Sequence, residues 1–161
     1  MAKAKEIKTN AMRILETMKI PYETHTYECE EFHDGIQIAD MLGQAYDKVY
    51  KTLVTQGASK NYFVFVIPID QELDMKKAAK SVGEKSVSMI HVKDITAVTG
   101  YIRGGCTAIG MKKQFVTRIQ VDAQVLDTII VSGGKLGMQI ELKPEDLLKA
   151  SKAEYADIIM K

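Results

Sequence analysis

The sequence predicts a single α/β domain over residues 1–161, in which helices pack on a mixed β-sheet. A chain of 161 residues is long enough for one domain with a hydrophobic core, and 46% hydrophobic with 27% charged residues is an ordinary globular balance. Segments with helical spacing of apolar residues alternate with segments of strand character, which is typical of this class. No repeat or linker divides the chain.

The N-terminal half predicts helices and strands in turn. Helices are expected at 7–18, which Pro21 ends, at 34–43, which Gly43 ends, and at 74–83, which has an Asp cap. Strands are expected at 22–28, 47–57 and 61–68. The last of these is apolar on both faces, which is typical of a central strand, and the turn before it is of hairpin type.

The C-terminal half continues the alternation around a glycine-dense loop at 100–110. Strands are expected at 86–90, 115–122, 128–134 and 138–142. Helices are expected at 91–100 and at 144–151, which has Pro in its first turn, and residues 152–161 are expected to add a final helical turn or two.

Charge and cysteine content exclude several classes of protein. The formal net charge is +1, whereas a protein that binds nucleic acid by itself usually carries a strong basic excess, so any RNA contact is expected to be local, weak or shared with a partner. Two distant cysteines form neither a disulfide framework nor a zinc motif. No signal peptide and no apolar run of about 18 residues is evident. The expected location is the cytoplasm, with no membrane contact.

Two glycine-rich stretches are the first candidates for a site. One contains Gly100, Gly104, Gly105 and Gly110, and the other contains Gly133, Gly134 and Gly137. Glycine lets a ligand approach the backbone, and consecutive N–H groups can hold an anion or a carbonyl oxygen. Neither stretch has P-loop or dinucleotide-binding spacing. Two tight turns are the alternative interpretation, but two such loops in one small domain favour a ligand site.

Lys51 stands out because it interrupts an otherwise apolar strand, on the same face as Val49 and Leu53. It could guard a sheet edge or extend its ammonium to water. It could anchor a phosphate or a carbonyl group. It could also be a desolvated lysine of lowered pKa that acts as a base or nucleophile. Thr52, on the opposite face, is expected to pack or to form a local hydrogen bond.

The remaining polar residues form no recognisable catalytic set. His25, His33 and His91 lack metal-ligand spacing, so no metal and no cofactor is expected. Cys106 could be a nucleophile, but no neighbouring base is evident and a buried structural thiol is commoner. Ser132 lacks the G-x-S-x-G pattern, which favours a backbone-stabilising or substrate-binding hydroxyl. The residues alone therefore predict a small-ligand pocket lined by Lys51 and the two glycine loops.

Five stretches, in order, resemble the YbaK/EbsC family of aminoacyl-tRNA deacylases. They are "HTYE" (25–28), "VYKTL" (49–53), "LDMKKAAKSVG" (73–83), "TGYIRGGCTAIGMKK" (99–113) and "VSGGKLGMQIEL" (131–142). That family is related to the editing domain of bacterial prolyl-tRNA synthetases. The resemblance implies a partly barrel-like mixed sheet with flanking helices.

The resemblance also implies an activity, clearance of Cys-tRNA(Pro), and with it Cys-tRNA(Cys), in trans. A synthetase pocket built for proline cannot strongly exclude residues of similar or smaller size, so a second site removes the wrong product. For a cysteinyl ester the family implies a substrate-assisted route, in which the substrate thiol attacks its own carbonyl and leaves as a thiolactone. Prolyl-tRNA synthetase is the implied partner that supplies tRNA selectivity, and the oligomeric state stays open.

The family motifs assign roles to individual residues. Lys51 is the characteristic functional lysine, and Gly104 and Gly105 are implied to donate N–H groups near the scissile carbonyl. Substrate binding is implied for the residues Tyr27, Phe32, Thr52, Tyr101, Ser132, Gly133 and Gly134.

Three features depart from the family pattern. Thr107-Ala108 replaces the usual Ser-Pro, Gln139 replaces an acidic residue, and Phe32 is only a candidate for a pocket phenylalanine. All three bear on amino-acid specificity. The alternatives are therefore a deacylase for another small amino acid such as alanine, and a non-catalytic module that binds aminoacyl-tRNA or a small ligand.

Overall fold

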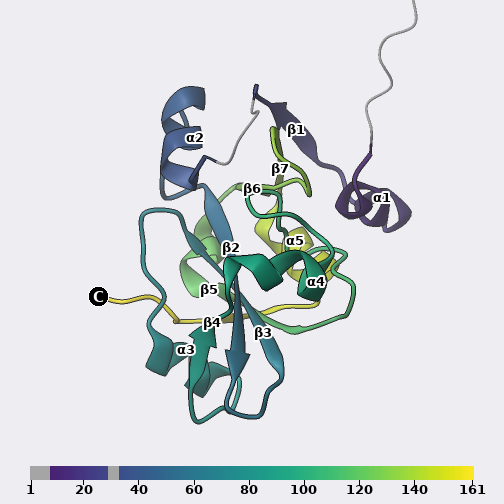
Figure 1. Ribbon diagram of the computed structural model, residues 1–161. Coiled ribbons are helices and arrows are strands. Elements are labelled where there is room, and N and C mark those ends of the chain that lie inside the picture. The colour runs from purple at the N-terminus through teal and green to yellow at the C-terminus, as the bar shows by residue number, and fades with distance from the viewer. Residues whose placement is uncertain (1–7, 29–32) are drawn as a thin grey trace, which may run out of the picture.

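The strands of the chain form two sheets, seen in the computed structural model that describes residues 8–28 and 33–161 (Figure 1). The three-stranded sheet has the order β1 (Glu23–Thr26), β7 (Met138–Leu142), β6 (Ile129–Ser132). The five-stranded sheet has the order β4 (Val87–Met89), β2 (Tyr50–Gly57), β3 (Tyr62–Pro68), β5 (Val116–Gln120), β8 (Glu154–Ala156).

The larger sheet is mixed, as the sequence predicts. β2 and β3 form an antiparallel hairpin, whereas β3 with β5 and β5 with β8 are parallel. β3 is the central strand, and six of its seven residues are buried, in agreement with its apolar sequence. The two sheets are not closed into a barrel: among the described residues their backbones are joined at an isolated parallel bridge between Val49 and Ile130, and side chains of both sheets share the largest core cluster. The joint between the sheets leaves room for a site.

In the described part of the chain, seven helical segments surround the sheets. They are α1 (Asn10–Thr17), α2 (Gly35–Leu42), α3 (Met75–Ser81), the 3-10 helix η1 (Val92–Asp94), α4 (Ile95–Thr99), the 3-10 helix η2 (Val121–Val125) and α5 (Pro144–Ser151). The sequence signals act as expected in α2: Asp34 and Gln37 form a capping box, and Gly43 ends the helix with φ of 65°. These signals set the two ends of α2, which packs beside the joint between the sheets.

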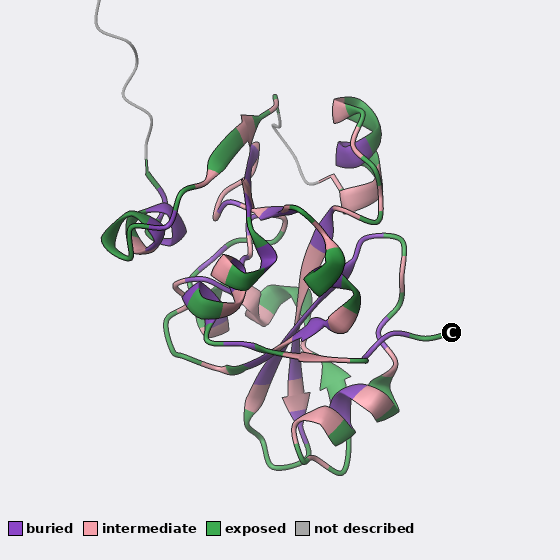
Figure 2. Cartoon of the chain, turned by 180° about the vertical axis from the view of Figure 1, so that it is seen from behind, coloured by how far each residue is buried: buried purple, intermediate pink, exposed green. Residues whose placement is uncertain are grey.

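The hydrophobic core is divided into three clusters, and Figure 2 shows buried residues running through the strands with exposed residues on the outer turns of the helices. The largest cluster joins α1 and α5 to β6 and β7, and the second lies under α3. The third holds α2 at the joint through Ala39, Val49, Ile69 and Ile130. Within the described residues no helix is long and apolar enough to cross a membrane.

The C-terminal segment corrects one expectation. Residues 152–161 do not form a helical turn: Glu154–Ala156 is strand β8, and Ile159 bridges back to Leu73. The backbone of Lys152 adopts φ of 54° and ends α5 there. The extended segment runs along β5 and leaves Ile158 fully buried. The burial of this apolar side chain favours the extended path over a helical turn.

Candidate active site

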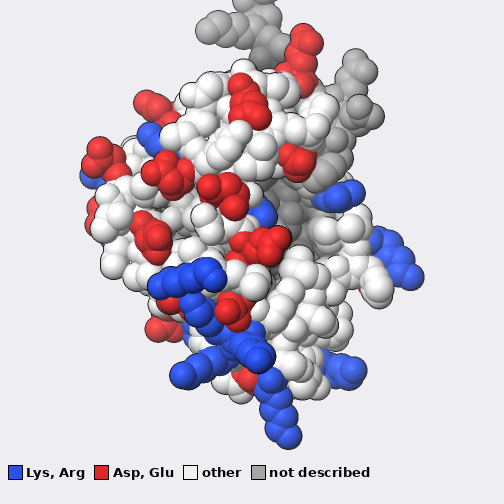
Figure 3. All heavy atoms as spheres, turned by 90° about the vertical axis from the view of Figure 1, so that its left-hand side faces the viewer, with Lys and Arg blue, Asp and Glu red and all other residues white. Residues whose placement is uncertain are grey.

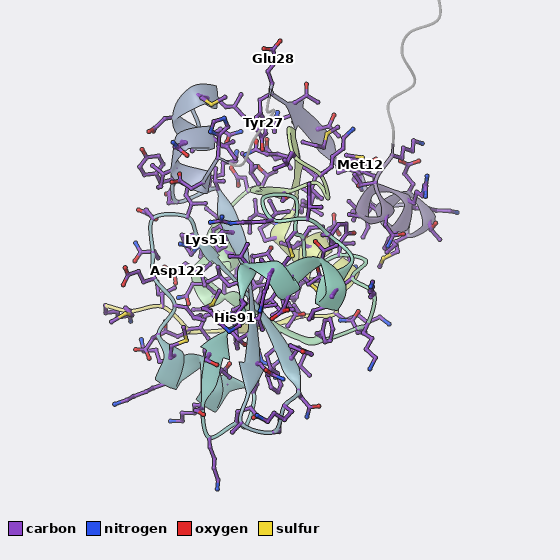
Figure 4. The ribbon with its side chains drawn as sticks, viewed as in Figure 1. Met12, Tyr27, Glu28, Lys51, His91 and Asp122 are labelled. Carbon is purple, nitrogen blue, oxygen red and sulfur yellow. The ribbon has the colours of Figure 1, made fainter. Side chains whose placement is uncertain are left out.

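A pocket of about 340 Å³ lies at the joint between the two sheets. That volume is typical of sites for small ligands. Most of its walls come from residues 49–54 in and just before β2, the N-terminal turn of α2, the segment from β4 to α4, the first glycine loop and the β6–β7 hairpin. Tyr27 after β1 and Ile69 after β3 complete the lining. Figure 4 shows Lys51 on β2 and Tyr27 above it, at the end of β1. The strongest prediction from sequence, Lys51, therefore does line a pocket.

The pocket lies where the hydrogen-bonded ladder on one edge of β2 is interrupted. β4 pairs with this edge only at Thr55–Gly57, and the bridge to β6 is made at Val49. The Ile90 N–H donates to the Val54 carbonyl oxygen at 3.2 Å, so even-numbered residues of β2 present their backbone groups to this edge. Thr52 lies between the two attachments, and no strand ladder among the described residues includes it on this side.

Lys51 is half-buried in the pocket wall. Among the residues that the structure describes, no hydrogen bond or ion pair holds its ammonium. Burial lowers the pKa of Lys51, and the carboxylates of Glu72, Asp70 and Asp34 partly oppose that change. β4 covers β2 only at Thr55–Gly57, so Lys51 lies beside the uncovered stretch of this strand, and there it lines the pocket. The arrangement favours a lysine that receives a polar group of a ligand.

One wall of the pocket is apolar and another is rich in backbone. The apolar wall is made by Met89, Ile90, Val92 and Ile95, which run from β4 into α4. The opposite wall contains Gly104, whose φ is 85°, and Ser132, whose hydroxyl lies 3.5 Å from the Gly104 carbonyl oxygen and 3.5 Å from the Gly134 amide nitrogen. Ser132 thus connects the two glycine loops, as expected of a residue that fixes the shape of this wall.

Two predicted site residues, Gly105 and Tyr101, do not line the pocket. The Gly105 N–H donates to the Ile102 carbonyl oxygen at 3.0 Å, and a Cβ atom on Gly105 would lie 2.7 Å from Lys135 Cα. The Tyr101 hydroxyl donates to the Ile109 carbonyl oxygen at 2.6 Å inside the protein. Gly105 and Tyr101 are therefore placed to hold the loops together, and neither lines the pocket.

Gly133 and Gly134 also support the pocket without lining it. The Gly133 carbonyl oxygen accepts from the hydroxyl of Thr9, the N-cap of α1, at 2.6 Å. Tyr27 and Thr52 line the pocket as predicted, whereas Phe32 lies outside the described residues.

Sequence reasoning gave no pocket position to His33, and it weighed Cys106 and Gln139 without placing them; all three line the pocket. Burial raises the pKa of Cys106 to about 11, although a hydrogen bond with Thr99 acts in the opposite direction, so the thiol stays protonated at neutral pH. No hydrogen bond joins His33 to Cys106 or Ser132 in the described part of the chain. The pocket therefore lacks a preformed nucleophile–base pair.

Gln139 forms a neutral polar floor with a partner from another element. Its side chain is 5% exposed. The Gln44 amide donates to Gln139 Oε1 at 2.8 Å, and the Gln139 amide donates back to Gln44 Oε1 at 3.2 Å. Each amide therefore fixes the orientation of the other. Gln44 follows α2 and Gln139 belongs to β7, so no local signal in the sequence could have predicted that they pair.

A group of potential metal ligands lies outside this pocket. Ligand atoms of Glu23, His25 and Glu141 lie within 4.8 Å of one another. Glu141, however, already accepts hydrogen bonds from Lys48 at 2.8 Å and from Thr128. A lysine ammonium at the same carboxylate opposes a second cation there. The arrangement is that of a structural ion-pair network between β1 and β7.

The chain matches a known protein family and a full-length relative. The family of aminoacyl-tRNA editing domains matches residues 29–150. The Enterococcus faecalis protein named "Putative Cys-tRNA(Pro)/Cys-tRNA(Cys) deacylase EbsC" is 50% identical over 163 aligned residues, which cover 100% of this chain and 99% of that protein. The uncharacterized protein YwhH of Bacillus subtilis is 24% identical over 115 residues, 71% of this chain and 73% of that one.

Solved structures share the fold at low sequence identity. A protein described as "a putative trans-editing enzyme for prolyl tRNA synthetase" superposes with a TM-score of 0.80 at 20% identity, covering 97% of this chain and 100% of that one. The hypothetical protein APE2540 superposes with a TM-score of 0.85 at 18% identity, covering 94% and 99%. At such identities the likeness concerns the fold alone, and it confirms the predicted mixed α/β architecture.

Proposed function

This chain belongs to the family of aminoacyl-tRNA editing domains, and we propose that it is a deacylase that clears cysteine from mischarged tRNA(Pro) and from tRNA(Cys). The observation that carries the proposal is the half-buried Lys51 in a small-ligand pocket whose described residues form no nucleophile–base pair. The E. faecalis relative named as such a deacylase is 50% identical over the whole chain, which supports the choice of substrate.

The pocket offers hydrogen-bond donors for the aminoacyl ester and for the oxyanion that forms from its carbonyl group. The Lys51 amine carries donor hydrogens in either protonation state, so it can hold the ester carbonyl or the phosphate of the terminal adenosine. The backbone N–H of Thr52, on the interrupted edge of β2, and that of Gly104 are candidates for stabilising the oxyanion. Gly105 is a weaker candidate because its N–H already donates to Ile102.

The chemistry proposed is substrate-assisted. The sulfur of the cysteinyl group attacks the carbonyl carbon of its own ester, the C–S bond forms, and the ribose oxygen leaves with a proton. The products are a thiolactone and a free 3′ end. The protein then supplies orientation and charge stabilisation, which suits a pocket without a nucleophile of its own. A thiol of pKa about 11 at Cys106 does not compete for this role.

The proposal is tested by following ester loss from Cys-tRNA(Pro), Ala-tRNA(Pro) and Pro-tRNA(Pro). Lys51→Met keeps the apolar bulk of the side chain and removes its amine, and it is expected to lower kcat/KM for the cysteinyl ester by at least about 100-fold. Lys85→Ala is the matched control, because Lys85 is an exposed lysine between α3 and β4 that does not line the pocket. Mass spectrometry of the product identifies the thiolactone.

Each alternative predicts a different result. Rapid loss of the alanyl ester would identify a deacylase for small amino acids and argue against the substrate thiol as nucleophile. Binding of Cys-tRNA(Pro) with no loss of any ester, in the presence of prolyl-tRNA synthetase, would identify a binding module. An S-methylcysteinyl ester that is cleaved as fast as the cysteinyl ester would contradict the thiolactone route but not the deacylase.

Prolyl-tRNA synthetase is the proposed source of tRNA selectivity. With a net charge of +1 the protein has little general attraction for RNA, so free tRNAs should bind weakly and with little discrimination. A synthetase that already holds tRNA(Pro) raises the local concentration of its 3′ end. The purified protein alone should therefore deacylate Cys-tRNA(Pro) and Cys-tRNA(Cys) at similar rates, and strong preference for tRNA(Pro) without the synthetase would contradict this partnership.

A further inference from the structure

The two glycine loops carry a group of basic residues beside the pocket. This group, the cationic flank, consists of Arg103, Lys112, Lys113 and Lys135. Arg103 is exposed and lines the pocket. The loop that carries it lies against the backbone of Lys135, since a Cβ on Gly105 would lie 2.7 Å from Lys135 Cα. Lys135 therefore lies beside the loop that carries Arg103. Lys112 is attached to the end of α4, where its N–H donates to the Thr99 carbonyl oxygen at 2.9 Å, and Lys113 follows it in the chain.

The cationic flank contains no acidic residue of its own. Residues 95–121 and 128–140, which include both glycine loops, have no Asp or Glu. Lys113 is exposed and Lys135 partly exposed, and neither forms an ion pair with any residue that the structure describes. The Lys112 ammonium donates to the Ala97 carbonyl oxygen at 3.2 Å, which holds its charge beside α4. The ammonium groups of Lys113 and Lys135 are available to an anionic partner.

The opposite side of the pocket has the reverse charge. Asp34 lines the pocket at the start of α2, and the exposed residues Asp70 and Glu72 follow directly after β3. Figure 3 shows acidic side chains spread over the face that carries α2 and the loop after β3, with basic side chains gathered at the α3 end of that face. No residue of α3 lines the pocket, and Lys77 there is paired with Asp157 at 3.1 Å.

We propose that the 3′ strand of the bound tRNA leaves the pocket over the cationic flank and away from the acidic face. This inference rests on the proposed function, because the aminoacyl ester in the pocket fixes where the strand begins. Every nucleotide beyond the terminal adenosine adds one phosphate charge, which acids at the pocket mouth repel and lysines attract. The flank is small, which agrees with a net charge of +1 and with weak binding of free tRNA.

The test compares two double charge reversals. Lys113→Glu with Lys135→Glu alters the cationic flank, and Lys76→Glu with Lys80→Glu makes the same change in charge on exposed residues of α3. Binding of a fluorescent acceptor-stem RNA ending in CCA is measured by anisotropy across a range of salt. The flank variant should bind roughly 10-fold more weakly, and its dependence of log K on log salt should be shallower by about 1.4, for two lost contacts at about 0.7 each.

Activity gives the second readout. Turnover of cysteinyl-tRNA should fall in the flank variant, whereas turnover of the cysteinyl ester of adenosine, which has no phosphate, should change less than about two-fold. Equal loss of RNA binding in the α3 variant, or no loss in the flank variant, would overturn the proposed path. If the wild-type protein cleaves neither ester, the proposed function fails, while the binding comparison still tests whether RNA uses the cationic flank.

Discussion

Glu141 on β7 is expected to make the stability of the protein depend on pH. One carboxylate oxygen lies 2.6 Å from His25 Nε2, and the other accepts hydrogen bonds from Lys48 at 2.8 Å and from the Thr128 hydroxyl. Burial alone would raise the pKa of Glu141, but the hydrogen bonds from Lys48, Thr128 and His25 outweigh it and hold the pKa at about 2. The network ties β1 to β7, and so supports the strands that carry Tyr27 and Gln139.

The size and sign of the effect follow from that pKa. A decrease from 4.5 to about 2 corresponds to about 3 kcal/mol at roughly 1.4 kcal/mol per pH unit. The Lys48 side chain is 37% exposed, so screening by solvent reduces the expected contribution to about 2 kcal/mol. Because the folded pKa lies below the unfolded one, this stability is present above pH 4.5 and is lost as the pH falls from 4.5 toward 2.

The assay is urea unfolding of the wild-type protein and Glu141→Gln at several pH values. At about pH 7 the variant should have a free energy of unfolding lower by about 2 kcal/mol, and the difference should shrink as the pH falls below 4.5. Glu23→Gln is the matched control, since Glu23 faces Glu141 across the β1–β7 ladder and is exposed. A difference that stays constant with pH, or an equal loss in Glu23→Gln, would refute the reasoning.

Three further predictions concern the pocket and its supports. Gln44→Ala removes both hydrogen bonds to the buried Gln139 amide and should lower the free energy of unfolding by about 1–2 kcal/mol, seen as a lower thermal midpoint; an unchanged midpoint would show that water replaces the pair. Gly105→Ala places a methyl group 2.7 Å from Lys135 Cα, so the loop must shift. We expect kcat to fall clearly while the thermal midpoint changes little, and an unchanged kcat would show that the loop does not position the ester. Cys106, with its pKa raised to about 11, should react slowly with iodoacetamide at neutral pH and rapidly only near pH 11, as followed by peptide-resolved mass spectrometry; fast alkylation at neutral pH would contradict its burial.

Local signals in the sequence predicted most of the secondary structure. The capping box of Asp34 and Gln37 and the fully apolar strand at 61–68 correspond to α2 and β3. The C-terminal strand β8 could not be predicted in this way, because it is specified by distant partners: it pairs with β5, and Ile159 bridges to Leu73. How far the predicted mixed sheet closes on itself could not be predicted either, since closure depends on the pairing of strands far apart in the sequence.

Site residues could be predicted where the residue type differs from what the local secondary structure requires. Lys51 interrupts an apolar strand, and Ser132 and Gly104 lie in glycine-rich turns, so each gave a local signal. The apolar wall from Met89 to Ile95 gave none, because apolar residues on a short strand and helix are indistinguishable from core in sequence. The Gln44–Gln139 pair is visible only in three dimensions.

The pairing of β1 with β7 bears on how and when the protein acquires its activity. Among the described strands, β1 in the N-terminal part pairs with β7 alone, and β8 in the C-terminal part completes the other sheet. Folding is therefore dominated by contacts between residues far apart in sequence, which slows the search for the native topology. Because Tyr27 follows β1 and Gln139 belongs to β7, the pocket cannot assemble on a nascent chain until most of the protein has been synthesised.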